Sequence, residues 1–288
     1  MILITGAGGK TGRALIKTLS KAESICALAH RQEQIPVLKS LGAEKIILGD
    51  LRDDDAIRYA MQSVRAVYHI CPNMSLDEVA IGKLVIEEAR KVGVEHFVYH
   101  SVMHPQTEKM KHHWQKLRVE ERIFESGLPF TILQPAPYMQ NLLTGWKSIV
   151  EDGILRVPYS VYSKFSFVDL EDVAEAAKNV LTEPNHLYAI YEFAGTFPIS
   201  HVEVAAVFQH LLNRDVRAEK EEIGDWRLRT EKSGPSQYAR DTLAEMFEYY
   251  DQWGLVGNPN VLRWILKREP TSMELFVERI VKDRDIIH

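Results

Sequence analysis

The residues nearest the N-terminus have a spacing suited to holding phosphate groups. Residues 5–13 read TGAGGKTGR, so glycines recur at Gly6, Gly9 and Gly12 directly after the apolar run 1–5. Glycine at these places allows a tight turn, lets backbone N–H groups approach a pyrophosphate and lets the next helix pack close to a sheet. That helix also turns its N-terminal donors toward the phosphates. The loop predicts dinucleotide binding, with a purely structural turn as the alternative, through Gly6, Ala7, Gly8, Gly9, Lys10, Thr11 and Gly12.

Two residues at the end of the second apolar run indicate which dinucleotide is bound. An acidic residue about 20 positions after the glycines holds the ribose 2′-hydroxyl of NAD, but none occurs from Ser24 to Gln32. His30 and Arg31 occupy that place instead. A guanidinium pairs with a 2′-phosphate through charge-assisted hydrogen bonds. We therefore expect NADP(H) in preference to NAD(H), unless the two residues are ordinary solvated side chains at a strand end.

Six short apolar runs, alternating with helical patterns, must position these residues. They lie at 1–5, 24–29, 44–48, 65–70, 95–100 and 130–134. Between them, apolar residues recur at three- and four-residue spacing, as at Leu15 and Leu19. Runs that are apolar nearly throughout are typical of strands buried on both faces. Alternation of strand and helix then predicts an α/β fold with a doubly wound parallel sheet.

The pattern loosens after Pro135, which indicates a second region. We expect β-like pieces at 153–157 and 165–168, a helix at about 170–182, a strand at 188–194, a helix at 201–213 and mostly helix from about 222. The predicted organisation is a dinucleotide-binding domain over 1–152 and a smaller, mixed and mostly helical substrate-binding region over 153–288. Part of that second region could return to the first sheet.

Composition excludes several classes of protein. The 288 residues carry 35 basic and 40 acidic side chains, a net charge of −5, which gives no general attraction to nucleic acid or anionic membrane. Apolar runs stay well short of the roughly 18 residues of a membrane span. Two cysteines, Cys26 and Cys71, support neither a disulfide scaffold nor a structural zinc site. We expect a cytoplasmic protein that binds no metal, no nucleic acid directly and no membrane.

Later motifs carry a family resemblance. They are 49–51 (GDL), 97–101 (FVYHS), His112-x-x-x-Lys116 with Glu120, 127–135 (GLPFTILQP), Asp169-x-x-Asp172-Val173-Ala174 and 257–262 (GNPNVL). Together with the glycine loop, they resemble the NmrA-like family of atypical short-chain dehydrogenases/reductases, over nearly the whole chain. The resemblance implies a Rossmann sheet with a smaller C-terminal substrate region. That family includes NADPH-dependent reductases of quinones, dyes and plant phenolics, and members that only sense dinucleotides.

The resemblance also implies further dinucleotide contacts. These are Asp50 and Leu51 near the adenine, Cys71, Pro72 and Asn73 along the dinucleotide path, Lys83 near the cofactor, and Ala136, Pro137, Tyr138 and Met139 near the nicotinamide. Independently, ligands of open parallel sheets bind outside the carboxyl ends of the strands, where Asp50, Cys71 and Ser101 fall. Each residue has a plainer alternative: Asp50 as a helix cap, Cys71 as a small buried filler and Lys83 as a solvated lysine.

The implied catalytic site has one residue changed. Lys116 matches the lysine of the Tyr-x-x-x-Lys pair of short-chain dehydrogenases, but the position four before it is His112. Residues four apart share a helix face, and histidine exchanges protons near neutral pH. His112 is thus a candidate for the missing acid, with a surface position as the alternative. Tyr138 is a second candidate donor, and Ser101 could orient a carbonyl.

Loss of the tyrosine weighs against ordinary alcohol–ketone interconversion. Hydride transfer to a quinone, enone, iminium ion or dye needs less of a positioned acid, because the nicotinamide carries the chemistry. We therefore predict an NADPH-dependent reductase of an electrophilic small molecule. The alternative is an NmrA-type regulator that senses NADP(H) and binds a protein partner without turnover. A sugar-nucleotide epimerase or dehydratase would normally want the missing tyrosine.

Overall fold

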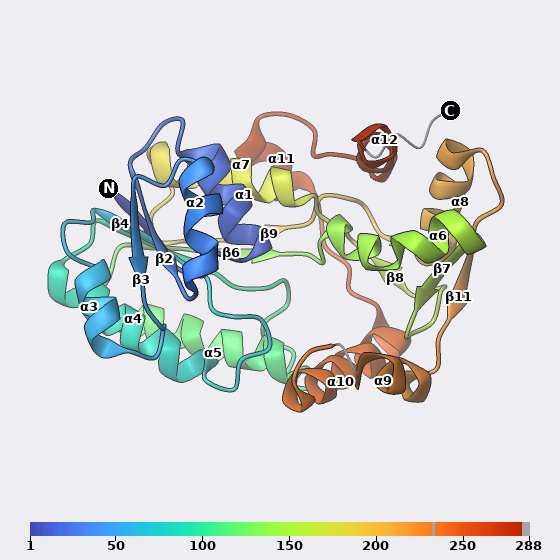
Figure 1. Cartoon of the computed structure of the whole chain (residues 1–288), viewed down its shortest axis with the longest axis horizontal. Coiled ribbons are helices and arrows are strands. Elements are labelled where there is room, and N and C mark those ends of the chain that lie inside the picture. The colour runs from blue at the N-terminus through green and yellow to red at the C-terminus, as the bar shows by residue number, and fades with distance from the viewer. Residues whose placement is uncertain (232–233, 284–288) are drawn as a thin grey trace. The chain divides into compact units, whose positions relative to one another are not determined.

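The computed structural model describes residues 1–231 and 234–283, which fall into two compact units. The first unit comprises Met1–Glu108, His112–Pro135 and Val173–Tyr191. The second comprises Lys109–Lys111, Ala136–Asp172 and the chain from Glu192 onward. The chain therefore passes between the units several times (Figure 1).

A seven-stranded sheet forms the centre of the first unit. Its strands are β1 (Ile2–Ile4), β2 (Ile25–Ala29), β3 (Lys45–Leu48), β4 (Ala66–His69), β5 (His96–His100), β6 (Phe130–Pro135) and β9 (Ala189–Phe193), in the order β3-β2-β1-β4-β5-β6-β9. Strands β1 to β6 pair in parallel, with Leu3 opposite both Cys26 and Val67. Each of the six runs expected before Pro135 is a strand within one residue of its predicted bounds. The predicted α/β fold with a doubly wound sheet is confirmed.

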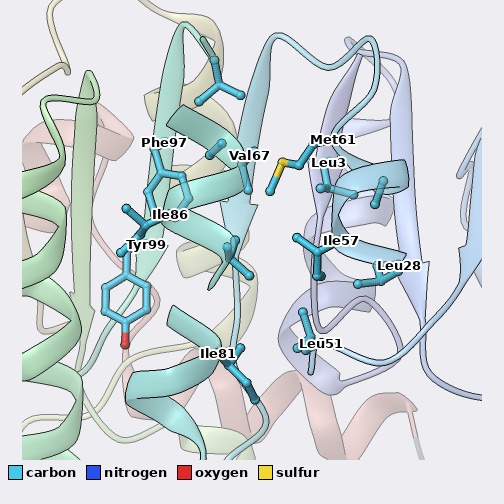
Figure 2. Packing of buried hydrophobic residues seen from close by; sticks show 14 of the residues in the cluster. Leu3, Leu28, Leu51, Ile57, Met61, Val67, Ile81, Ile86, Phe97 and Tyr99 are labelled. Carbon is cyan, nitrogen blue, oxygen red and sulfur yellow. The ribbon is translucent and has the colours of Figure 1, made fainter. Parts of the chain in front are cut away.

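Helices connect these strands. They are α1 (Lys10–Leu19), the 3-10 turn η1 (Gln32–Gln34), α2 (Ile35–Ser40), α3 (Asp54–Ala60), α4 (Glu78–Val92), α5 (Lys111–Ser126) and α7 (Leu170–Thr182). Side chains of α3, α4 and α5 pack with those of the strands into one apolar core, part of which Figure 2 shows. Gly82 lets α4 and α5 approach, because a Cβ there would lie 2.7 Å from Val119 Cγ1. At one edge of the cluster, the Tyr99 hydroxyl is directed away from Phe97 and Ile86 (Figure 2).

The second unit has short strands and more helix. Its elements are η2 (Met139–Gly145), α6 (Trp146–Asp152), β7 (Ile154–Val157), β8 (Lys164–Phe165), β10 (Ile199–Ser200), α8 (His201–Leu212), β11 (Arg217–Lys220), α9 (Ile223–Glu231), α10 (Gln237–Trp253), α11 (Asn260–Leu266) and α12 (Met273–Asp283). Strand β10 pairs antiparallel with β8, and β11 pairs in parallel with β7. Within residues 1–231 and 234–283, no helix is long and apolar enough to cross a membrane.

Two buried acids tie C-terminal segments to this unit. Asp169 accepts hydrogen bonds from Gln140 and from Arg279, each at 2.6 Å. Asp172 accepts 2.7 Å and 2.6 Å bonds from the Arg268 guanidinium and the Thr271 backbone N–H. Because both carboxylates are buried, they need these partners. The 169–172 motif therefore has a structural task in this chain.

Candidate functional site

The glycine loop is built from backbone that tolerates no side chain at two positions. Gly6 has a φ of +59°, and a Cβ there would lie 2.7 Å from the Ile70 carbonyl oxygen. A Cβ on Gly12 would lie 2.6 Å from both the Ala7 Cα and the Gly6 carbonyl oxygen. Gly9 is the N-cap of α1 and brings no side-chain oxygen to the first-turn N–H groups. This is the arrangement in which a helix N-terminus accepts an anion.

The end of β2 is fastened to this loop through one glutamine that the motifs did not single out. Gln34 Oε1 accepts the backbone N–H groups of His30 and Arg31, at 2.9 and 3.1 Å. The Gln34 amide also lies against Gly8, where a Cβ would come within 2.2 Å of Nε2. His30 and Arg31 are both exposed. The structure therefore places both predicted residues close to the glycine loop.

An ion pair follows β3 beside this region. Asp50 accepts from the Arg52 guanidinium at both oxygens, at 2.9 and 2.7 Å, and its Oδ2 lies 3.6 Å from His30 Nδ1. Hydrogen bonds from Arg52 hold the pKa of Asp50 well below its ordinary value. The helix-cap alternative for Asp50 is wrong, because Asp53 caps α3. Leu51 lies in the apolar core of the sheet.

The predicted dinucleotide contacts on and before α4 differ in how exposed they are to solvent. Cys71 is buried, and burial and the nearby Glu78 raise the pKa of its thiol well above the usual range, so it is inert at neutral pH. Pro72 and Asn73 are exposed. The Lys83 side chain is 66% exposed on α4, and its Nζ lies 3.8 Å from Glu87 Oε1.

The four residues after β6 belong to the second unit. Ala136 and Met139 are buried there, and their backbone N–H groups donate to the carbonyls of Phe193 and Val168. Pro137 and Tyr138 are half-buried. Tyr138 also forms an isolated bridge with Val168.

Lys116 lies in the interior of the first unit, in an ion pair. Its Nζ donates to Glu78 Oε1 at 2.9 Å and to the His100 carbonyl at 3.1 Å, and it lies 5.1 Å from the centre of the Tyr99 ring. The Tyr99 hydroxyl donates to the same Glu78 oxygen, also at 2.9 Å. Side-chain exposure is 5% for Lys116 and 0% for Glu78. The ammonium ion is thus fixed at the carboxyl end of β5.

His112 is on the same helix and is also buried, so the surface alternative is wrong. Burial lowers its pKa well below the ordinary value, and the charge of Lys116 adds to this. Its Nδ1 atom is buried without a hydrogen-bond partner among the described residues. At neutral pH His112 is therefore an uncharged imidazole, which does not deliver a proton as an imidazolium ion would.

Ser101 is hydrogen-bonded to a second buried carboxylate, that of Glu120. Its hydroxyl donates to Glu120 Oε1, and the Gln134 amide donates to both Glu120 oxygens, at 3.0 and 3.1 Å. Burial raises the pKa of Glu120. Within the first unit, Ser101 therefore positions Glu120 rather than pointing a free hydroxyl at a ligand.

Glu78 is the main residue that the motifs missed. It opens α4 and stands three, four and seven positions before Ile81, Gly82 and Val85, which are buried on that helix. A charge on an otherwise apolar stripe signals a buried partner. The pattern could have revealed Glu78, although not that its partner is Lys116, 38 residues away.

The chain is similar to known proteins in both sequence and fold. A model of the NmrA-like family matches residues 1–277. The NAD(P)H azoreductase of Xenophilus azovorans is 30% identical over 220 residues, which cover 75% of this chain and 76% of that protein. Quinone oxidoreductase 2 of Escherichia coli is 24% identical over 276 residues, covering 95% and 96% of the two chains. A crystal structure of the NADPH-dependent quinone oxidoreductase of Escherichia coli complexed with NADPH has a TM-score of 0.85 at 23% identity, covering 97% of this chain and 99% of that one. The resemblance seen in the motifs is confirmed.

Proposed function

We propose that this chain, which belongs to the NmrA-like family, is an NADPH-dependent reductase of an electrophilic small molecule such as a quinone, an enone, an iminium ion or a dye. The observation that carries the proposal is the glycine loop, with no space for a side chain at Gly6 or Gly12. The loop follows β1, whose neighbours β2 and β4 mark the place where strand order reverses. Ligands of open parallel sheets bind at such a point. The relatives named azoreductase and quinone oxidoreductase support this class of reaction.

The residues after β2 and β3 fit the 2′-phosphate of NADP(H). Arg31 and its neighbour His30 are exposed, and Gln34, which lies against Gly8, accepts the backbone N–H groups of both. Asp50 is already neutralised by Arg52, so it is poorly suited to hold the 2′-hydroxyl of NAD. We assign the dinucleotide to Gly6, Ala7, Gly8, Gly9, Lys10, Thr11, Gly12, His30 and Arg31.

Bound NADPH supplies the hydride, and the chain's own residues supply orientation and charge. Lys116 provides a fixed positive charge at the carboxyl end of β5. His112 is neutral at ordinary pH because burial lowers its pKa. With neither a tyrosine nor a charged histidine at position 112, the site suits acceptors that take a hydride without a positioned protein acid.

The proposal is tested by titrating the protein with NADPH and NADH and then adding a panel of quinones, enones and azo dyes. Oxidation of NADPH, read as loss of the near-ultraviolet absorbance of the reduced nicotinamide, would support the reductase. Absence of any dinucleotide binding would overturn the proposal. Tight binding without turnover on the whole panel would favour the sensor, for which the replacement of tyrosine by His112 is the supporting observation.

Arg31→Ala tests the choice of dinucleotide. A hydrogen bond to a charged group contributes about 1.5–3 kcal/mol, so NADPH affinity should fall about 10- to 100-fold while NADH affinity changes little. Arg90→Ala, at the exposed end of α4, is the matched control and should leave both affinities unchanged. Equal weakening of NADPH and NADH by Arg31→Ala would remove the assignment.

A further inference from the structure

The ion pair between Glu78 and Lys116 is unusual because both partners are removed from solvent. Glu78 is the first residue of α4, and Lys116 lies in the middle of α5. Glu78 Oε1 accepts both from Lys116 and from the Tyr99 hydroxyl, whereas Oε2 is buried without a partner among the described residues. The carboxylate therefore accepts both of these hydrogen bonds at one oxygen, Oε1, which is the atom that contacts Lys116.

Stability alone is a poor explanation for such a pair. Taking two charges out of water costs several kcal/mol per ion, and replacing a buried pair by apolar residues is often neutral or stabilising. The unpartnered Oε2 adds to that cost. The position that the pair gives to Lys116 offers a second explanation.

The other titratable groups around Lys116 do not replace Glu78 as its counter-ion. They are His69, Cys71, Tyr99, His100, His112, His113 and Glu120. Burial lowers the pKa of His69 and of His100 to about 3, so both are neutral. Glu120 has a raised pKa and is bonded to Ser101 and Gln134.

We propose that Glu78 is a positioning residue, which supplies the counter-charge of the buried Lys116 and directs its Nζ to the carboxyl end of β5. The inference rests on the proposed function, in which Lys116 supplies a fixed positive charge near the bound dinucleotide. A buried ammonium ion without a counter-ion loses its proton readily. Glu78 is the carboxylate that pairs with Lys116 and, with the His100 carbonyl, fixes where its Nζ lies.

Glu78→Gln is the informative variant, because glutamine retains the size of the side chain and an oxygen acceptor for Tyr99 while removing the charge. Glu88→Gln is its matched control. Glu88 is on the same helix and is 2% exposed, but it pairs with Lys91 and Arg58. Each variant removes one buried carboxylate from α4. Only Glu78→Gln removes the carboxylate that pairs with Lys116.

The first readout is the protonation of Lys116 itself, followed by NMR of lysine labelled with ¹³C and ¹⁵N, with Lys116→Met to assign the signal. Glu78→Gln should lower the midpoint of Lys116 deprotonation by about 1–3 pH units, and Glu88→Gln should not move it. Equal midpoints in the two variants would overturn the proposal. Because this measurement needs neither dinucleotide nor acceptor, it stands even where the reductase assay fails.

The second readout is a double-mutant cycle on NADPH affinity and on kcat/KM. If Glu78 acts through Lys116, Glu78→Gln with Lys116→Met should be no worse than Lys116→Met alone. The loss in Glu78→Gln alone should also deepen as the pH rises, because the neutral amine then predominates. Additive losses, or a loss independent of pH, would refute the positioning role.

A third measurement covers the case in which Glu78→Gln does not fold. The combined variant removes both charges and should recover folding in urea denaturation, because no buried charge is left uncompensated. Failure of the combined variant to recover, with Lys116→Met folded, would show that Glu78 supports the fold independently of Lys116 and would also overturn the proposal.

Discussion

Gly12→Ala should damage both the stability of the first unit and its affinity for NADPH. The added methyl carbon would lie 2.6 Å from the Ala7 Cα, 2.6 Å from the Gly6 carbonyl oxygen and 2.8 Å from the Ala7 carbonyl oxygen. Favourable contacts between carbon atoms are found at about 3.5–4.0 Å. All three neighbours are backbone atoms of one loop, so no side-chain rotation relieves the clash. Either the loop or the start of α1 must move.

The magnitude follows from two opposing effects. Overpacking a rigid site costs about 1–3 kcal/mol. Alanine is favoured over glycine within a helix by about 1 kcal/mol, which offsets part of that cost. The net loss of stability should be about 0–2 kcal/mol. Displacement of even one N–H group from a phosphate should lower NADPH affinity about tenfold or more.

Urea denaturation and NADPH titration measure the two effects. Gly224→Ala in α9 is the control, since a Cβ there meets no atom within 4 Å among the residues that the structure describes. It should leave NADPH affinity unchanged and preserve or slightly raise stability. If Gly12→Ala matches this control in both the urea midpoint and the Kd for NADPH, the steric reasoning is refuted.

Two further predictions concern the second unit. Burial lowers the pKa of His201 from 6.5 to about 4, so the unfolded chain takes up the extra proton first and stability falls as the pH drops from about 6.5 to about 4. His201→Phe should reduce that loss by up to roughly 3 kcal/mol in urea denaturation at the two pH values, and an unchanged acid loss would contradict the prediction. Asp172→Asn should cost about 1–3 kcal/mol, because it weakens the buried bonds to Arg268 and Thr271. Exposed Glu171→Gln should cost about 0–1 kcal/mol, and equal urea midpoints for the two variants would contradict that difference.

Strands β1, β2, β4 and β5 could be predicted because each is a short run that is buried along its whole length, as Ile25–Ala29 is. The hydrophobic pattern that predicts a strand weakens where one face of the strand is exposed to solvent. Strand β11, Arg217–Lys220, reads RAEK and has no buried residue, so its pairing with β7 leaves no trace in hydrophobic periodicity. Such a strand is specified by its neighbour rather than by its own pattern.

The candidate site was predictable where its chemistry is local. The residues of the glycine loop are contiguous in sequence. The lack of space for a side chain at Gly6 and Gly12 can be inferred from the glycines themselves. Lys116 and His112 could be placed on one helix face, but neither their burial nor the partner of Lys116 follows from spacing. The pairing with Glu78 joins two helices through the tertiary fold.

The distribution of unsatisfied polar atoms argues for where this unit binds its ligand. Near the amino ends of the strands, His96 Nε2 is partnered by Thr131 Oγ1 at 2.8 Å. Among the described residues of the first unit, three buried side-chain atoms lack partners, namely His69 Nε2, Glu78 Oε2 and His112 Nδ1. His69 ends β4, Glu78 opens the helix after it and His112 lies near the start of the helix after β5. Buried polar atoms are costly unless paired, so these three atoms place that cost near the ends of the strands where parallel sheets bind ligands. The cost is explained if these atoms serve the site rather than the core.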